Sequence, residues 1–252
     1  MNIAWENKEN NLKNVENAVV QAAKNSADIL FLPEMCLTGF SMNIGNTAEN
    51  DFYTVNKMKN LCKIYNIALG FGWARTCGEK AENCYTVLDN NGNELSTYVK
   101  IHPFSYSNED EFFQKGKFLT RYKINNTVFS TVICYDTRFP ELFQGICKNQ
   151  DVTAVVIPAN WPAKRASHWR VLTKARAIEN QVYILAVNCV GNIGGVEYSG
   201  DTCVINPNGE IIACCDSTQQ IIYADLDYDI DKLRNSFPVS ADRQIELYKS
   251  IL

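Results

Sequence analysis

Short apolar runs rich in β-branched residues alternate with segments of helical periodicity along this chain, and this alternation favours a fold in which helices cover β-sheets. Apolar side chains recur at helical spacing over 11–23, and the run 29–32 then has the pattern of a short buried strand. A second helix is predicted over 52–65, followed by a strand near 67–73. The first part of the chain therefore predicts an α/β arrangement.

The rest of the chain adds hairpins to this alternation. Strands predicted at 84–88 and 94–100 flank Asn90-Asn91-Gly92-Asn93, a strong hairpin signal. The β-branched run 127–134 leads into a predicted helix over 140–148, with Pro140 in its first turn. Beyond it we expect a strand at 152–157, a helix at 165–180, and strands at 182–190, 198–205, 210–214 and 221–226. Hairpins among strand–helix units indicate mixed sheets.

No linker or low-complexity tract divides the chain, so residues 1–252 are predicted to form a single domain. Its beginning is unusual, because only Ile3-Ala4-Trp5 precedes the first helix. A typical strand has about 5–6 residues, so this segment is too short to be a normal first strand.

The charge balance excludes some partners. Lys plus Arg number 24 and Asp plus Glu 28, a net charge of −4. This gives no electrostatic reason to expect a nucleic acid or an anionic membrane as a partner. The longest apolar runs, such as 182–187, are far short of the roughly 20 residues that cross a bilayer. The N-terminus has no apolar segment of the kind found in secretory signals, so we expect a cytoplasmic protein.

Ten cysteines are scattered without a C-x-x-C pair, and the chain has only two histidines. This composition does not match a zinc site, and reduced thiols in the cytosol explain it better than a disulfide framework. Most of these thiols, including the vicinal pair Cys214-Cys215, are expected to pack as small apolar side chains. No metal or organic cofactor is indicated.

Three chemically versatile residues follow predicted strands, where α/β sheets present functional groups. Glu34 comes after the run 29–32, Lys100 ends the strand that begins at 94, and Cys134 ends the run 127–134. A thiol at such a turn can be exposed while nearby backbone N–H groups face an oxyanion. By position alone, a solvated carboxylate, a surface lysine and a buried thiol remain the commoner explanations.

The flanking residues change that balance. Three segments resemble the signature segments of the nitrilase (carbon–nitrogen hydrolase) superfamily, in the order of the family: Leu32-Pro33-Glu34-Met35-Cys36-Leu37-Thr38-Gly39-Phe40, Tyr98-Val99-Lys100-Ile101-His102-Pro103-Phe104, and Val132-Ile133-Cys134-Tyr135-Asp136-Thr137-Arg138-Phe139-Pro140-Glu141. Others are similar to the ω-amidase-like branch: Asn160-Trp161-Pro162, His168-Trp169, 175–181 and 198–202. The resemblance implies a four-layer α-β-β-α sandwich whose first N-terminal strand is missing or truncated here. A sheet edge would then be open to solvent or to a partner strand.

The resemblance also implies a catalytic set. Cys134 would be the nucleophile, Glu34 the general base and acid, and Lys100 with the N–H of Tyr135 would bind the oxyanion. These residue types suit the chemistry, because a free thiol has a pKa of about 8.5 and needs a base or a nearby cation to react at neutral pH. One carboxylate can then serve as base towards the thiol and as acid towards departing ammonia.

The family pattern includes a second glutamate after the lysine segment, and Glu109 fits it best. Asp110 and Glu111 are close competitors, for which a solvated acidic loop is the preferred interpretation. A second carboxylate beside Glu34 would raise an apparent pKa towards neutrality, as an acid–base role requires.

The remaining candidates lie near the same rim. Asn160 and Trp161 follow a strand end and are predicted to line the pocket. Arg138 and Glu141 have the spacing of an ion pair at a helix start. His168 is expected to pack within a helix.

The predicted function is hydrolysis of a small carboxamide through a thioester. The resemblance favours an ω-amide of a dicarboxylic acid, such as 2-oxoglutaramate or 2-oxosuccinamate. Alternatives within the family are an N-carbamoyl amino acid amidohydrolase, a deaminated-glutathione amidase and a nitrilase. An inactive binding or scaffold protein and a thiol redox protein are the non-hydrolytic alternatives. The resemblance also implies a homodimer or a higher homo-oligomer.

Overall fold

The computed structural model describes residues 1–227 and 229–251. Its first sheet has four strands in the order β1-β2-β3-β4. β1 pairs in parallel with β2, and the other pairs are antiparallel. The elements of this half are α1 (Lys8–Lys24), β1 (Ile29–Phe31), α2 (Ile44–Thr47), α3 (Tyr53–Tyr65), β2 (Ala68–Cys77), β3 (Lys80–Leu88) and β4 (Glu94–Val99). The Asn7 side chain caps α1 by accepting a hydrogen bond from the N–H of Asn10.

The second sheet has six strands in the order β12-β11-β8-β7-β6-β5, with parallel pairs at β6–β7 and β7–β8. Its strands are β5 (Tyr122–Ile124), β6 (Thr127–Thr131), β7 (Ala154–Pro158), β8 (Tyr183–Val187), β11 (Cys203–Ile205) and β12 (Ile211–Cys214). β9 (Val190–Ile193) and β10 (Val196–Ser199) form a separate hairpin. The helical elements of this region are η1 (Ser105–Ser107), α4 (Glu109–Phe112), η2 (Cys134–Arg138), α5 (Pro140–Ile146), η3 (Ala163–Arg165) and α6 (Ala166–Asn180).

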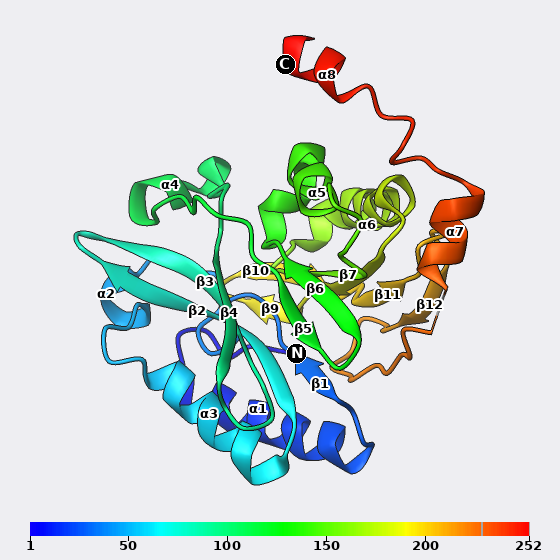
Figure 1. The fold of residues 1–252 in the computed structure, drawn as a ribbon. Coiled ribbons are helices and arrows are strands. Elements are labelled where there is room, and N and C mark those ends of the chain that lie inside the picture. The colour runs from blue at the N-terminus through cyan, green and yellow to red at the C-terminus, as the bar shows by residue number, and fades with distance from the viewer. Residues whose placement is uncertain (228, 252) are drawn as a thin grey trace.

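Three apolar clusters join these elements into layers (Figure 1). Val15 of α1 and Met58 of α3 pack with the first sheet, and α5 and α6 cover the second sheet through a cluster that includes Trp169. Between the sheets, Tyr85 and Tyr98 belong to one cluster with Phe129, Val156 and Tyr183. The expected α-β-β-α sandwich is therefore confirmed.

Several strand predictions need correction. The predicted strands near 67–73 and 84–88 are longer and join in a second hairpin, where Gly78 adopts φ 61°. The predicted strand 127–134 ends at Thr131, and Cys134 adopts φ 46°, which an extended strand does not allow. The predicted strands 182–190 and 198–205 are each interrupted, so that 190–199 forms the β9–β10 hairpin.

The prediction of a strand at 221–226 is wrong. Within the described residues, 219–226 makes no backbone–backbone hydrogen bond, although Ile222 and Leu226 still pack against the core between the sheets. A strand exists only where a neighbour pairs with it, and an apolar pattern reports burial rather than pairing.

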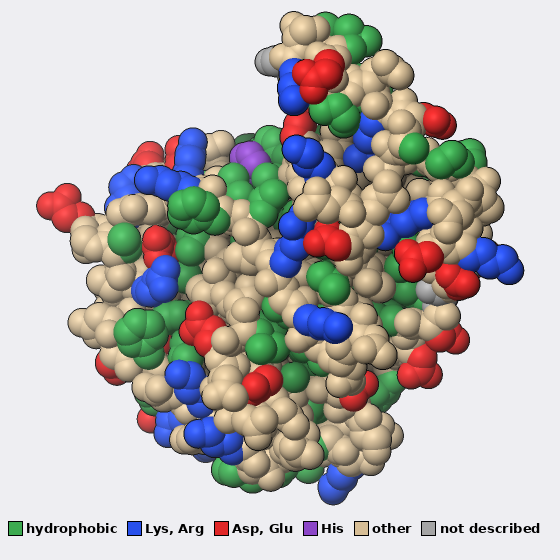
Figure 2. All heavy atoms as spheres, viewed as in Figure 1, with side chains coloured by type: hydrophobic (Ala, Val, Ile, Leu, Met, Phe, Trp, Pro, Cys, Tyr) green, Lys and Arg blue, Asp and Glu red, His purple; other side chains and the backbone are tan. Residues whose placement is uncertain are grey.

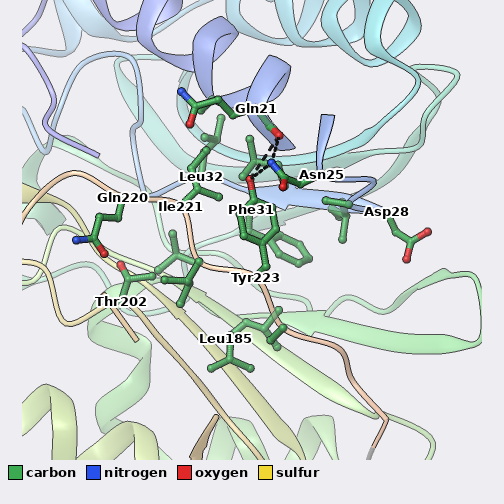
Figure 3. A pocket seen from close by; sticks show the side chains of 18 of the residues that line it. Gln21, Asn25, Asp28, Phe31, Leu32, Leu185, Thr202, Gln220, Ile221 and Tyr223 are labelled. Atoms are coloured by element: carbon green, nitrogen blue, oxygen red, sulfur yellow. Dashed lines mark hydrogen bonds between the residues drawn. The ribbon is translucent and has the colours of Figure 1, made fainter. Parts of the chain in front are cut away.

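β1 is an edge strand of the first sheet, with β2 as its only strand neighbour in the described chain. A cavity of about 1220 Å³ lies beside it, lined by residues of α1, β1, the second sheet and 219–226. Figure 3 shows Phe31, Leu185 and Ile221 in its wall. The Tyr223 hydroxyl accepts a hydrogen bond from the side chain of Asn25, the C-cap of α1, and donates to the carbonyl of Gln21 within α1.

The C-terminal segment carries two helices that the sequence did not predict, α7 (Ile230–Ser236) and α8 (Ile245–Ile251). α8 projects away from the sheets (Figure 1), and none of its described side chains is buried. The face drawn in Figure 2 carries interspersed acidic and basic side chains. Among the helices of the described chain, none is both long and apolar enough to span a membrane.

Candidate active site

Four strands of the two sheets end around one site. Glu34 follows β1 and Lys100 follows β4, both from the first sheet, while Cys134 follows β6 and Asn160 follows β7, both from the second. The side chains of Glu34, Lys100 and Asn160 are buried, and Cys134 is half-buried. The fold therefore brings together Glu34, Lys100 and Cys134, although 66 positions separate Glu34 from Lys100 and 34 positions separate Lys100 from Cys134 along the chain.

The backbone at Glu34 passes directly over β2. A Cβ atom on Gly72 would lie 2.4 Å from the N atom of Met35 and 2.7 Å from the Cα atom of Glu34. Only glycine allows this approach. Met35 itself adopts φ 44°, so the chain turns sharply just after the carboxylate. This turn aims the Glu34 side chain into the interior.

Lys100 lies between two buried carboxylates. Its Nζ atom is 3.0 Å from Oε1 of Glu34 and 2.8 Å from Oε2 of Glu109. The amide of Asn83 also donates to both carboxylates, at 2.7 Å to Glu34 and 2.9 Å to Glu109. Glu109 is buried while Asp110 and Glu111 are exposed, so the structure places Glu109, and neither competitor, in the cluster.

The electrostatics of the cluster follow from burial and charge. Burial alone would lower the pKa of Lys100, but the charges of Glu109 and Glu34 outweigh it and raise that pKa, so the ammonium is retained. The pKa of Glu109 is raised, mainly because burial disfavours its charged form and further by the charge of Glu34, while Lys100 opposes this shift. One cation thus serves two carboxylates, and the cluster is poised to hold a proton.

Cys134 begins η2 with a left-handed backbone, which presents its side chain at a turn instead of along a strand. Its Sγ atom lies 3.9 Å from the carbonyl oxygen of Asn160. Burial raises the pKa of this thiol well above its usual range, and the charge of Glu34 adds to the shift while Lys100 opposes it. The resting group is therefore a neutral thiol that needs a base when it reacts.

Asp136 fixes the turn that carries Cys134. Its buried carboxylate accepts hydrogen bonds from the N–H of Ile133 at 3.0 Å, the hydroxyl of Tyr98 at 2.8 Å and the N–H of His102 at 2.9 Å. The His102 ring stacks on Phe139, with the centroids 3.7 Å apart, and its Nδ1 atom also contacts Asp136. His102 thus supports the turn from the side of the lysine segment.

Asn160 and Trp161, which were predicted to line the pocket, and Tyr135, which was predicted to donate its N–H to the oxyanion, also lie at this site. Asn160 donates from its backbone N–H to Oε2 of Glu34 at 2.8 Å and from its side chain to the Glu34 carbonyl at 2.6 Å. Trp161 is buried, with its indole donating to the Arg165 carbonyl. Tyr135 is half-buried, 4.8 Å from the Phe104 ring.

Three minor predictions are wrong. Arg138 makes no ion pair with Glu141 in the described structure, and its guanidinium contacts Nδ1 of His168 instead. The His168 side chain is exposed to solvent near the start of α6, whereas it was predicted to pack against its neighbours. Cys214 is exposed because it lies on β12, the outer strand of its sheet.

Sequence reasoning missed two asparagines that organise the site. Asn83 bridges Glu34 and Glu109 from the middle of β3, and Asn188 holds the backbone of Trp161 at 2.8 Å. A polar residue inside an otherwise apolar strand was the available signal, since a buried amide must find partners. The described residues contain no group of three His, Cys, Asp or Glu side chains suited to holding a metal ion.

The layered α/β fold places a cysteine, a lysine and a glutamate after strand ends and a second glutamate at the start of α4, and this set defines a class of hydrolases that use a thiol. The family model described as carbon-nitrogen hydrolase matches residues 1–235, so this chain belongs to the carbon–nitrogen hydrolase family. It is an enzyme family that acts on C–N bonds.

Named relatives agree with this membership. The chain is 30% identical over 242 residues to the 2-oxoglutaramate amidase of Bacillus subtilis, covering 94% of this chain and 93% of the relative. It is 33% identical over 228 residues to a hydrolase in the agr operon of Staphylococcus lugdunensis, covering 88% and 97%. Among solved structures, XC1258 from Xanthomonas campestris, a CN-hydrolase superfamily protein with an arsenic adduct in its active site, has a TM-score of 0.87 at 25% identity over 96% of this chain and 94% of its own.

Proposed function

We propose that this chain hydrolyses the terminal amide of a small ω-amide of a dicarboxylic acid, such as 2-oxoglutaramate or 2-oxosuccinamate, to the acid and ammonia. The observation that carries the reaction type is the buried Glu34–Lys100–Glu109 cluster next to the neutral thiol of Cys134. The substrate class is supported by relatives named 2-oxoglutaramate amidase and omega-amidase.

The proposed reaction begins with transfer of the Cys134 proton to Glu34 as Sγ attacks the amide carbon. A base is needed at this step because the thiol's pKa is raised. The Nζ atom of Lys100 and the N–H of Tyr135 donate to the oxyanion that forms. Glu34 then gives the proton to the departing nitrogen, and ammonia leaves a thioester on Cys134.

Hydrolysis of the thioester completes the cycle. Glu34 removes a proton from water as the oxygen attacks the thioester carbon, and the thiolate leaves and is reprotonated. The net change is amide plus water to carboxylic acid plus ammonia. Glu109 touches no reacting atom in this scheme and acts through Lys100, which it holds at 2.8 Å.

The proposal extends to the setting of the enzyme. Residues 1–252 act as a single carbon–nitrogen hydrolase domain, in the cytoplasm, as a homodimer or a higher homo-oligomer. The cytoplasmic location is proposed from the ten scattered cysteines, which contain no C-x-x-C pair and do not match a disulfide framework. A single mass equal to that of one chain in light scattering at micromolar concentration would contradict the oligomer.

Ammonia release from 2-oxoglutaramate tests the substrate, with an N-carbamoyl amino acid, deaminated glutathione and an aliphatic nitrile as comparison compounds. We expect 2-oxoglutaramate to have the highest kcat/KM of the four. Failure to release ammonia from it, together with turnover of a comparison compound, would overturn the ω-amide assignment and keep the family chemistry. Intact-protein mass spectrometry of a rapidly quenched reaction should show an acyl adduct that Cys134→Ala lacks.

A further inference from the structure

Two arginines of the described structure, Arg138 of η2 and Arg165 of η3, differ from the other six. Six of the eight arginines have a carboxylate or backbone-carbonyl partner for the side chain within the described structure: Arg75, Arg121, Arg170, Arg176, Arg234 and Arg243. Arg138 and Arg165 have no such partner there. The only side-chain hydrogen-bond contact of the Arg138 guanidinium within the described structure is with Nδ1 of His168, at 3.4 Å.

Aromatic rings place the Arg138 guanidinium close to the nucleophile. It lies 4.6 Å from the centroid of the Trp161 ring and 5.9 Å from that of Tyr135. Tyr135 directly follows Cys134, and Trp161 directly follows Asn160, the residue that holds Glu34. Arg138 therefore lies on the wall of the site itself.

Arg165 approaches the same site from η3. Its guanidinium is 4.8 Å from the ring centroid of Tyr106 and 5.5 Å from that of Phe104. The Phe104 ring in turn lies 4.8 Å from Tyr135. A continuous aromatic wall thus connects the two cations.

The two guanidinium groups also influence each other. Burial lowers the pKa of Arg138, and the positive charge of Arg165 lowers it further, while Tyr135 and Cys134 oppose the shift. Arg138 nevertheless remains charged at neutral pH, as arginine does in proteins. Two half-buried like charges repel each other, and a carboxylate bound to both guanidinium groups would offset that repulsion.

We propose that Arg138 and Arg165 bind the carboxylate of the substrate at the end opposite its amide and thereby select anionic amides. This inference rests on the proposed amide hydrolysis at Cys134. The Glu34–Lys100–Glu109 cluster favours this orientation of the substrate, because its two carboxylates share one lysine and repel the substrate's carboxylate. The carboxylate is held at the cationic wall, and the uncharged amide is the end that faces Cys134.

A matched substrate pair tests the inference. Glutaramate and pentanamide have the same chain length and the same terminal amide, but only glutaramate carries a carboxylate. For Arg138→Gln and for Arg165→Gln we expect kcat/KM on glutaramate to fall by about 10- to 100-fold, mainly through KM, since this is the range of one charged hydrogen bond. The loss on pentanamide should stay below about threefold, as expected where no charge pair is removed.

Two further variants make the result specific. Arg165→Lys keeps the charge and should recover part of the glutaramate activity. Lys174→Gln removes one exposed positive charge elsewhere on α6 and should alter neither substrate's kinetics. Equal losses on glutaramate and pentanamide, or no loss on glutaramate, would overturn the inference. Thermal melting identifies a misfolded variant, and Arg138→Lys then replaces Arg138→Gln while Arg165→Lys replaces Arg165→Gln.

Binding without turnover separates this inference from the proposed function. Calorimetric titration of Cys134→Ala with glutaramate, which carries one carboxylate and one amide, should give a Kd that weakens about tenfold or more when Arg138→Gln or Arg165→Gln is added. If 2-oxoglutaramate is not hydrolysed but glutaramate binding depends on both arginines, the ω-amide assignment fails and the carboxylate site stands. If 2-oxoglutaramate is hydrolysed but glutaramate binding does not depend on the arginines, the carboxylate site fails.

Discussion

The two surroundings of strand β1 are opposites. At its carboxyl end, the Glu34 carboxylate accepts hydrogen bonds from Asn83, Lys100 and Asn160, and in this cluster Asn83 Oδ1 alone lacks a partner among the described residues. Along its outer edge, no strand of the described chain pairs with β1, and a cavity of about 1220 Å³ takes that place. One three-residue strand thus joins the most constrained part of the molecule to one of its least constrained parts.

The contrast shows which contacts hold the catalytic end. The N–H of Leu32 donates to the Gly70 carbonyl, and the N–H of Cys36 donates to the Gly72 carbonyl, so the chain on both sides of Glu34 is fixed to β2. The Glu34 carboxylate itself accepts from the side chains of Asn83 and Lys100 in the first sheet and from the backbone N–H of Asn160, which follows β7 of the second sheet. An unpaired outer edge is therefore compatible with a well-ordered Glu34.

At the carboxyl end of β1, where the catalytic residues gather, removal of the nucleophile has the largest expected effect, which is on kcat. Cys134→Ala should lower kcat by about 10⁴-fold or more, because no other group can form the thioester. Ammonia release is the measurement. Cys77→Ala, which removes a half-buried thiol at the far end of β2, is the control and should keep its activity. Full activity of Cys134→Ala would refute the nucleophile assignment.

Removal of Lys100, the cation shared by the two carboxylates, should destabilise the protein. Lys100→Met leaves Glu34 and Glu109 buried without a counter-charge, and we expect the free energy of unfolding to fall by about 3–5 kcal/mol. Urea denaturation at pH 7 measures this. Adding Glu109→Gln to Lys100→Met should restore part of the loss, because one repelling charge disappears. A double variant no more stable than Lys100→Met would mean that the two carboxylates do not interact.

The buried thiols of Cys36 and Cys84 predict that the protein loses stability at alkaline pH. Burial raises the pKa of Cys36 and of Cys84 from about 9 to about 12. The folded state therefore holds these protons more tightly than the unfolded state, and their contribution is present below pH 9 and is lost as the pH rises towards 12. Each thiol contributes up to about 4 kcal/mol at the limit, since one pKa unit is about 1.36 kcal/mol.

Denaturant unfolding at pH 8, 9.5 and 11 measures that loss. Cys84→Ala should flatten the dependence of unfolding free energy on pH, because one thiol no longer titrates differently in the two states. Cys214→Ala is the control, since that thiol is exposed. Identical pH slopes for Cys84→Ala and the parent protein would show that Cys84 makes no such contribution.

The same contrast explains what the sequence could and could not predict. The positions of Glu34, Lys100 and Cys134 in the fold were predictable because each lies at the end of a predicted strand and in a segment that resembles a signature segment of the family. Asn83 was not, because its role depends on two carboxylates that only the folded chain brings beside it. The pairing of Arg138 with Glu141 failed because helix spacing says nothing of the aromatic wall across the site.

Strand predictions failed for a related reason. The segment 221–226 has an apolar pattern and is packed against the core, yet the described chain supplies no backbone partner for it. Burial is encoded locally by side-chain type, whereas pairing depends on a neighbour from elsewhere in the chain. In this segment Ile221, Ile222 and Leu226 pack partly buried against the core while 223–225 are exposed, and the strand predicted from the apolar pattern is wrong.

The smallest predicted effect concerns the open edge. Backbone groups of successive strand residues face opposite sides, so those of Ile29 and Phe31 face the cavity, while Leu32 donates to Gly70. We expect the amide of Phe31 to exchange with deuterium about tenfold or more faster than that of Leu32, because an unpaired amide needs no opening of a hydrogen bond. Residue-resolved exchange by NMR at pH 7 is the measurement.

An engineered strand sharpens this comparison. A six-residue apolar segment fused ahead of Met1, which lies in the wall of the cavity, should slow exchange at Phe31 and raise the Tm by a few degrees, about 2–4 °C per kcal/mol gained. A segment of the same length rich in Gly and Ser is the control and should do neither. Exchange at Leu32 should be the same in both fusions, because its partner is β2 in either case. Equal protection of Phe31 and Leu32 in the unfused protein would show that the edge of β1 is already paired, and the contrast between its two surroundings would then be lost.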